Sequence, residues 1–193
     1  MLKIVHRVND PAALAALAPE FGVEMDLHAF GDRLVVHHDA FSPGVDFEEW
    51  LDAYHHAFVI LNIKEEGIEG RVRERVLARG INRFFMLDLS FPALIKMIRA
   101  NEPRVALRVS EYEPAAGALI LTGQADWVWL DVFHGFPLGD ADYAALRSAG
   151  FKLCLVSPEL HGRPAEEVAF MRSQMDRHGF VVDAVCTKRP DLW

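Results

Sequence analysis

The sequence is poor in cysteine, lacks a hydrophobic run of membrane-spanning length and carries no excess of basic residues. Only two cysteines occur in 193 residues, Cys154 and Cys186, and each lies inside an apolar run. Two buried thiols without a disulfide framework favour a reducing compartment. Residues 1–10 also lack the apolar stretch of a signal peptide. We therefore expect a cytoplasmic protein that is not inserted in a membrane.

The charge balance is acidic, with a formal net charge of −8 at pH 7. This balance argues against broad attraction to nucleic acid or anionic lipid, although a local group of Lys and Arg could still hold a phosphate. Apolar residues make up 51% of the chain, enough for one sizeable core. We predict a single domain over residues 1–193 that binds a small molecule and no nucleic acid. The sequence leaves open whether it forms a homo-oligomer.

Short runs rich in Val, Ile, Leu and Phe alternate with helical patterns along the whole chain. A further run at 34–38 follows Gly31 and Asp32, which predicts an extra hairpin strand after the second strand. Strict alternation of strand and helix implies a parallel sheet with helices outside. The predicted strands of that sheet are 3–7, 23–27, 58–63, 83–89, 104–109, 127–132, 152–157 and 181–187.

Several residues mark where the predicted helices begin and end. Asp10 before Pro11, Asp46 three residues before Glu49, and Ser90 before Pro92 are typical of helix starts. Glycines favour the left-handed conformation that ends a helix, and they close three of the helical patterns, at Gly80, Gly150 and Gly179.

The α/β pattern is consistent with two architectures. An open, doubly wound sheet would be expected to carry a G-x-G-x-x-G turn after the first strand, where this chain has His6-Arg7-Val8-Asn9. A closed (β/α)8 TIM barrel of minimal size needs no such turn. We therefore predict the barrel, whose site would lie at the carboxyl ends of the strands.

Glu24 and Asp26 stand two apart on the second predicted strand, so their side chains point the same way. Two converging carboxylates repel each other unless a proton or a cation lies between them, and their oxygens suit Mg²⁺ or Ca²⁺. An ion pair with Lys64 or Arg108 would explain the two acids equally well. The spacing leaves both interpretations open.

Histidine supplies candidates for proton transfer. His6 and His38 are predicted to flank one barrel mouth, and two imidazoles, one taking a proton and one giving it, suit displacement at phosphorus. His37 is expected to face away from His38 on an extended segment. The remaining histidines are assigned by default to surfaces or helix faces: His28, His55, His56, His134, His161 and His178.

Basic side chains at predicted strand ends could neutralise phosphate oxygens. Arg7 and Arg108 offer a planar fork of donors, and Lys64 offers a point charge. A surface salt bridge is the alternative for each, and for Arg108 it is the preferred one.

These motifs together resemble the superfamily of glycerophosphodiester phosphodiesterases and phosphatidylinositol phospholipase C, nearly from end to end. The opening His-Arg, the Glu-x-Asp pair, the hairpin ending in His-Asp and the closing stretch occur in the order typical of that superfamily. In this chain they are His6-Arg7, Gly22-Val23-Glu24-Met25-Asp26, Leu34-Val35-Val36-His37-His38-Asp39 and residues 182–192.

The resemblance implies a phosphoric diester hydrolase with a divalent cation. It makes His6 and His38 the acid/base pair, Glu24 and Asp26 metal ligands, and Arg7 a phosphate contact. The implied substrate is a phosphodiester such as a glycerophosphodiester or a phospholipid headgroup.

The third strand departs from the pattern. Many members of the superfamily carry Glu-x-Lys there, whereas this chain has Asn62-Ile63-Lys64, so a neutral amide replaces an anionic ligand. Asp131 or Asp88 could supply the missing charge from a neighbouring strand end. Asn62 also favours an alternative, a barrel that binds phosphoryl ligands with little turnover. A sugar-phosphate lyase or isomerase using Lys64 as its base is a third hypothesis, without a matching motif.

Overall fold

The computed structural model describes all residues from Met1 to Trp193 and has the α/β class that the sequence predicts. The chain folds into two compact units. The N-terminal unit comprises Val5–Val105, and the C-terminal unit comprises Met1–Ile4 with Ala106–Trp193. No helix of either unit has the length and apolar character needed to cross a membrane.

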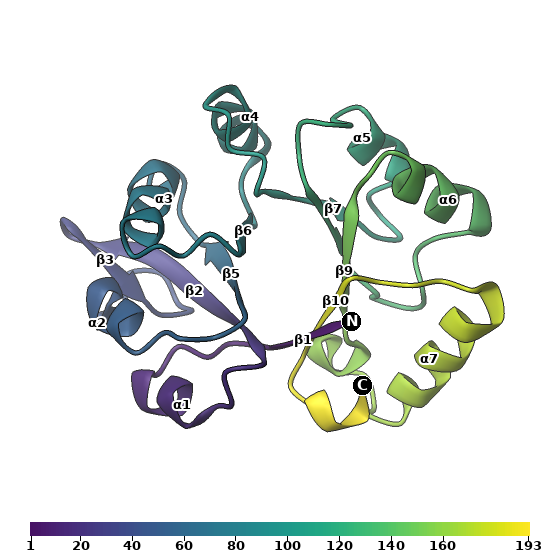
Figure 1. The fold of residues 1–193 in the computed structure, drawn as a ribbon, viewed down its shortest axis with the longest axis horizontal. Coiled ribbons are helices and arrows are strands. Elements are labelled where there is room, and N and C mark those ends of the chain that lie inside the picture. The colour runs from purple at the N-terminus through teal and green to yellow at the C-terminus, as the bar shows by residue number, and fades with distance from the viewer. The chain divides into compact units, whose positions relative to one another are not determined.

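The N-terminal unit contains a mixed sheet with the strand order β4-β3-β2-β5-β6. β2, β5 and β6 are parallel, whereas β3 pairs antiparallel with β2 from Leu27↔Val36 to Phe30↔Arg33. The helices of this unit run from purple to teal in Figure 1. The bounds are β2 (Gly22–Phe30), β3 (Arg33–Val36), β4 (Val45–Asp46), β5 (Phe58–Ile63), β6 (Phe84–Leu87), α1 (Pro11–Ala16), α2 (Phe47–Asp52), α3 (Glu69–Ala78) and α4 (Phe91–Arg99).

The C-terminal unit contains strands in the order β1-β10-β9-β8-β7. The pairs β7–β8, β8–β9 and β9–β10 are parallel, as expected for strands joined by helical crossovers. The bounds are β1 (Leu2–Val5), β7 (Ala106–Val109), β8 (Trp127–Leu130), β9 (Lys152–Val156), β10 (Ala184–Thr187), α5 (Ala115–Leu119), α6 (Asp140–Ser148) and α7 (Glu167–His178), with 3-10 turns at Pro158–His161 and Pro190–Leu192.

The helix signals of the sequence are largely confirmed. The side chains of Asp10 and Ser90 accept hydrogen bonds from backbone amides in the first turns of α1 and α4. Gly80, Gly150 and Gly179 have φ of 73°, 86° and 68°, the left-handed conformation predicted for helix ends.

β1 and β6 are among the strands that end earlier than predicted. β1 stops at Val5 rather than residue 7, because Arg7 adopts a left-handed backbone with φ of 57°. β6 stops at Leu87 rather than residue 89, because Asp88 has φ of 60°. Such angles are uncommon for residues other than glycine and cluster at functional sites. Both side chains therefore leave from turns and not from the strands themselves.

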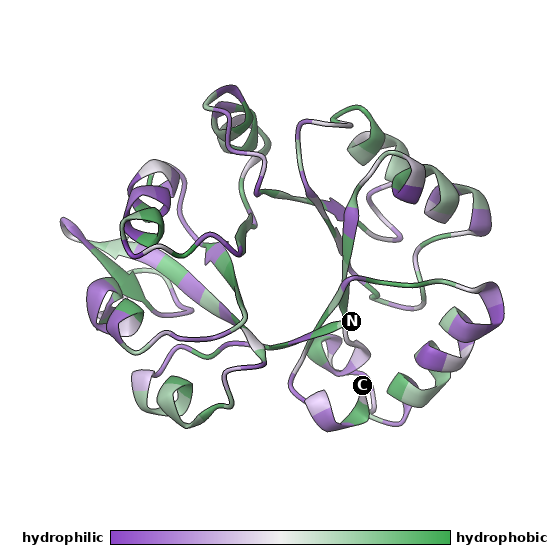
Figure 2. Cartoon of the chain, viewed as in Figure 1, coloured by the Kyte–Doolittle hydropathy of each residue, from purple (hydrophilic) through white to green (hydrophobic).

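β2 carries polar side chains inside the protein. Its apolar residues alternate with Glu24, Asp26 and His28, which are only 1%, 1% and 2% exposed. Successive residues of a strand face opposite sides, so these three polar side chains, spaced two apart, share one side of the sheet. Figure 2 shows hydrophilic bands along this otherwise hydrophobic strand. Burying two carboxyl groups is costly unless they are hydrogen-bonded or paired with charge.

Gly44 packs directly against the end of β3. A Cβ atom added there would lie 2.6 Å from the Val36 carbonyl oxygen and 2.9 Å from the His37 Cβ. We expect Gly44→Ala to destabilise the protein by about 1–3 kcal/mol, because the backbone must shift to relieve the clash. Urea unfolding would measure this. Gly70→Ala is the matched control, since no atom lies within 4 Å of its added Cβ. Equal stability of the two variants would contradict the prediction.

Candidate active site

Glu24 lies at the centre of a buried polar cluster in the N-terminal unit. Its Oε2 accepts a hydrogen bond from the Arg7 backbone amide at 2.7 Å, and its Oε1 accepts one from Asn62 Nδ2 at 2.8 Å. Burial, followed by the negative charge of Asp26, raises the pKa of Glu24 to about 7. The two acids therefore repel each other, as expected for carboxylates on one side of a strand.

Asp26 is surrounded by donors and positive charge. Asn9 Nδ2 donates to Asp26 Oδ2 at 2.9 Å, and the Asp26 amide donates to Asn9 Oδ1 at 3.0 Å. Lys64 Nζ lies 3.2 Å from Asp26 Oδ1, and Arg7 Nε lies 3.6 Å from Asp26 Oδ2. Of the two interpretations that the spacing left open, the ion pair with Lys64 is therefore present.

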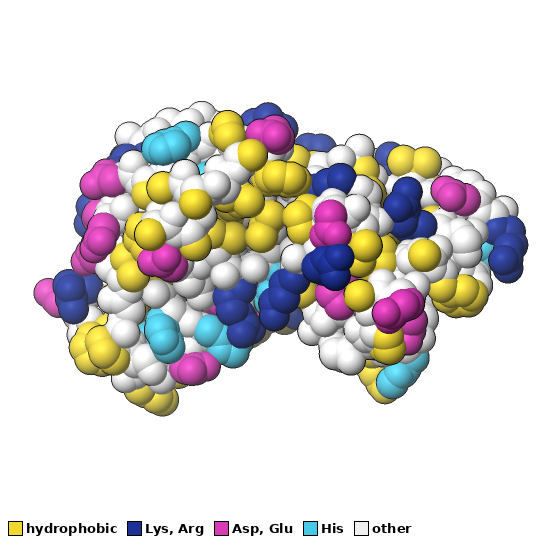
Figure 3. All heavy atoms as spheres, turned by 90° about the horizontal axis from the view of Figure 1, so that it is seen from below, with side chains coloured by type: hydrophobic (Ala, Val, Ile, Leu, Met, Phe, Trp, Pro, Cys, Tyr) yellow, Lys and Arg dark blue, Asp and Glu magenta, His cyan; other side chains and the backbone are white.

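The predicted histidines lie at one pocket. His6 Nε2 is 3.7 Å from Glu24 Oε2, and His38 Nδ1 is 2.7 Å from Asp39 Oδ1. His6, His38 and Arg7 line the same pocket of about 620 Å³. Figure 3 shows histidine side chains beside basic and acidic ones on one face of the molecule.

His37 also lines this pocket, so the expectation that it faces away is wrong. β3 ends at Val36, and strand alternation does not continue through the next two residues. Its Nδ1 accepts a hydrogen bond from the Asp39 amide at 3.0 Å, which holds the turn that carries His38.

Asn62 and Lys64 lie at the carboxyl end of β5. Asn62 is 6% exposed, and while its Nδ2 donates to Glu24, its buried Oδ1 has no hydrogen-bond partner. A buried acceptor without a partner is costly, and in native proteins it calls for an unseen water, ion or ligand. The Lys64 Nζ atom, which contacts Asp26, also lies 3.4 Å from the Oδ2 atom of Asp88.

These oxygens fit a hard divalent cation. The Glu24 and Asp26 carboxylates and the Asn62 Oδ1 atom are the ligand types that Mg²⁺ and Ca²⁺ prefer. No group of three His, Cys, Asp or Glu side chains is arranged for a metal, so the third protein ligand would be the Asn62 amide. A cation at this place would also relieve the repulsion that raises the pKa of Glu24.

The other two predicted site residues, Arg108 and Asp131, belong to the C-terminal unit. Arg108 Nη1 donates to Asp131 Oδ2, and His161 Nε2 lies 3.1 Å from Asp131 Oδ1. Burial lowers the pKa of His161. An ion pair was the preferred interpretation of Arg108, and the structure contains one. The phosphate-binding role of Arg108 and the metal-binding role of Asp131 stay predictions.

Some buried histidines differ from the sequence expectation. His28 and His56 were assigned to surfaces or helix faces, yet they are 2% and 9% exposed. His28 follows Asp26 by two residues, so the alternation of β2 could have shown that it shares the side of Glu24 and Asp26. Asn9, which holds Asp26, had no comparable signal in the sequence, whereas Asp39, which holds His38, is the last residue of the His-Asp hairpin motif.

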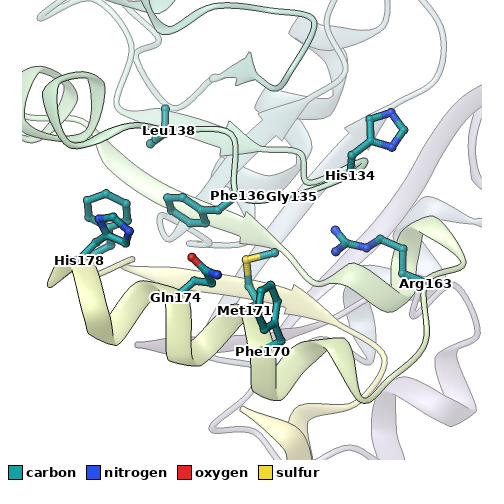
Figure 4. A pocket seen from close by; sticks show the side chains of 10 residues that line it. His134, Gly135, Phe136, Leu138, Arg163, Phe170, Met171, Gln174 and His178 are labelled. Carbon is teal, nitrogen blue, oxygen red and sulfur yellow. The ribbon is translucent and has the colours of Figure 1, made fainter.

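A second pocket, of about 280 Å³, lies in the C-terminal unit between the loop of residues 134–138 and α7. Figure 4 shows Phe136 from the loop and Phe170 and Met171 from the helix around it, with Arg163 at one edge. Arg163 is paired with Glu167. None of the predicted site residues lines this pocket.

Solved structures similar to this chain include glycerophosphodiester phosphodiesterases. The enzyme from Agrobacterium tumefaciens is 19% identical, with a TM-score of 0.66 over 100% of this chain and 97% of that one. The one from Thermotoga maritima is 17% identical, with a TM-score of 0.66 over 100% and 96%. A glycerophosphoryl diester phosphodiesterase from Parabacteroides distasonis is 13% identical, with a TM-score of 0.64 over 99% and 84%.

The chain thus has the fold of these diesterase structures along its whole length. No family model matches the sequence. No curated protein matches it either.

Proposed function

We propose that this protein is a phosphoric diester hydrolase that acts on a glycerophosphodiester or a related small diester. The observation that carries the proposal is one pocket lined by His6, His38 and Arg7, with the Glu24 carboxyl 3.7 Å from the His6 ring. A diesterase needs a proton acceptor, a proton donor and positive charge at one phosphorus atom, and the pocket offers all three. The fold shared with solved glycerophosphodiester phosphodiesterases supports the same reaction.

His38 is the better candidate for the base. Its Nδ1 donates to Asp39 Oδ1 at 2.7 Å in the tautomer that leaves Nε2 able to accept a proton. Nε2 takes the proton of a water molecule or of a neighbouring substrate hydroxyl as its oxygen bonds to phosphorus. His6 gives a proton to the alcohol oxygen as its bond to phosphorus breaks. Asp39 positions the His38 ring through this hydrogen bond.

Arg7 and Lys64 balance the charge of the diester. Arg7 is a residue of the pocket, and its side chain is 41% exposed, so its guanidinium can meet a phosphate oxygen. Glu24, Asp26 and Asn62 would hold a divalent cation, either Mg²⁺ or Ca²⁺. Such a cation supplies Lewis-acid polarisation of the phosphoryl oxygen when bound. The single (β/α)8 barrel over residues 1–193 and the cytoplasmic location stay predictions from the sequence.

The direct test is hydrolysis of glycerophosphocholine and bis-p-nitrophenyl phosphate by the full chain, with Mg²⁺, with Ca²⁺ and with EDTA. We expect turnover with one of the cations and little with EDTA. Asp26→Asn should abolish most of it, because a neutral side chain holds a dication less well. Glu74→Gln, at an exposed position of α3, is the matched control. A purified, folded protein without turnover on any diester of the panel would contradict the proposal.

One observation favours a second function, a protein that binds phosphoryl ligands without efficient turnover. The neutral Asn62 and the Lys64 ion pair leave less negative charge for a cation than three carboxylates would. Calorimetric titration with glycerophosphocholine distinguishes the two. Binding that depends on Arg7, without hydrolysis under any cation condition, would identify the binding protein.

A further inference from the structure

The pocket that holds the two candidate histidines is also lined by apolar side chains. Ala13 of α1 and Leu17, which directly follows the helix, line it together with Val5 and Val8. We refer to these four residues as the apolar lining. Ala13 is exposed, and Val5 and Leu17 are half-buried, so water covers part of this lining when the pocket holds no ligand. Replacing that water by an apolar group is favourable.

The surroundings of the apolar lining fit an aliphatic group. α1 reads Pro-Ala-Ala-Leu-Ala-Ala and carries no hydrogen-bonding side chain. Asp10, at the start of the helix, also lines the pocket, and its Oδ2 accepts a hydrogen bond from the Ala13 amide at 3.0 Å. A sugar needs several donors and acceptors around its hydroxyl groups, and a nucleobase is typically stacked on an aromatic ring. The pocket is lined by no Phe, Tyr or Trp.

The pocket also has room for more than a glycerol phosphate group. Its volume of about 620 Å³ equals the share of roughly twenty water molecules in the liquid. Glycerol phosphate, with about ten non-hydrogen atoms, fills roughly half of that volume. The remaining space is available to a further group of the same substrate.

We propose that this pocket binds an unbranched acyl or alkyl chain of its substrate, so that the diester is a single-chain lipid such as a lysophospholipid. This inference rests on the proposed function and narrows its substrate class. The phosphate meets Arg7 and the two histidines, while the chain lies against α1 over Ala13 and Leu17. Burial of the chain supplies binding free energy that a headgroup diester without a chain lacks.

The test is calorimetric titration of the full chain, in EDTA, with octyl-, decyl- and dodecylphosphocholine below their micelle concentrations, and with glycerophosphocholine. Each alkylphosphocholine is a phosphodiester with one unbranched chain. We expect the dissociation constant to fall by up to roughly fourfold for each methylene group that becomes buried. Ala13→Glu should flatten this dependence on chain length, because it places a charge in the apolar lining. A glutamate three residues after Asp10 is well tolerated at a helix start.

Ala15→Glu is the matched control, since Ala15 is an exposed residue of the same helix and lies outside the pocket. This variant should keep the chain-length dependence of the parent protein. The deciding quantity is that dependence rather than affinity itself, because an added negative charge weakens binding of every phosphodiester. Melting temperatures of both variants establish that they are folded.

The inference is overturned if the parent binds the three chain lengths equally, or if Ala13→Glu keeps the full dependence on chain length. Neither result requires turnover. Chain-dependent binding without hydrolysis of any diester would contradict the hydrolase and leave the lipid-binding pocket established. Hydrolysis of glycerophosphocholine without chain-dependent binding would contradict this inference and leave the hydrolase established.

Discussion

Replacement of His38 by alanine is expected to lower kcat for diester hydrolysis by a factor of about 10²–10⁴, the usual contribution of a general base. The loss should be similar for His6→Ala, because a diester cannot be cleaved quickly without a proton for the leaving alcohol. Both side chains line the pocket that holds Arg7, and neither is part of the buried core. Steady-state kinetics on glycerophosphocholine, with the favoured cation present, would measure both effects.

The two histidines should not act additively. If they serve opposite ends of one displacement, the double variant should be little worse than the poorer single variant, as in catalytic groups that act as a unit. His55→Ala is the matched control, because this histidine is exposed and lies outside the pocket. Full activity of either single variant would remove that histidine from the mechanism.

Glu24→Gln is expected to raise the stability of the cation-free protein relative to the parent by about 3 kcal/mol more at pH 8 than at pH 4.5. Burial and the Asp26 charge raise the pKa of Glu24 from 4.5 to about 7. A raised carboxyl pKa means that the folded state holds its proton more tightly than the unfolded state. The ionised group therefore costs stability, fully above the folded pKa and progressively less as the pH falls toward 4.5.

The stability difference between Glu24→Gln and the parent should thus shrink from pH 8 to pH 4.5. Urea unfolding in EDTA at several pH values would measure it, and the difference cancels contributions of other titrating groups. Glu74→Gln should show no such trend. Saturating cation should reduce the advantage of Glu24→Gln, because it would favour the ionised parent. A pH-independent difference between the two proteins would contradict the raised pKa.

Much of the candidate site was predictable from local sequence patterns. The spacing of Glu24 and Asp26 fixed their shared direction, and both are buried side by side on β2. The order of strands and helices, with caps such as Asp10 and Ser90, followed from short-range rules. These features depend on backbone geometry within one element, which neighbouring residues largely determine.

The contacts between elements were not predictable in the same way. The spacing of the residues did not predict whether Asp26 binds a cation or pairs with a lysine. It also did not predict that Asn62 donates a hydrogen bond to Glu24 while the Asn62 Oδ1 atom is buried without a partner. The direction of the His37 side chain was predicted wrongly because the end of β3 depends on how the hairpin packs against Gly44.

The sequence by itself determined the α/β alternation, the ends of helices at Gly80, Gly150 and Gly179, and the pairing of two acids on one side of a strand. Only the tertiary structure decided that Lys64 lies between Asp26 and Asp88 and that the pKa of Glu24 rises to about 7. The physical reason is the separation along the chain of the residues that determine each property. Side-chain direction follows from local dihedral angles, whereas distance, burial and charge coupling arise when residues far apart in sequence pack together.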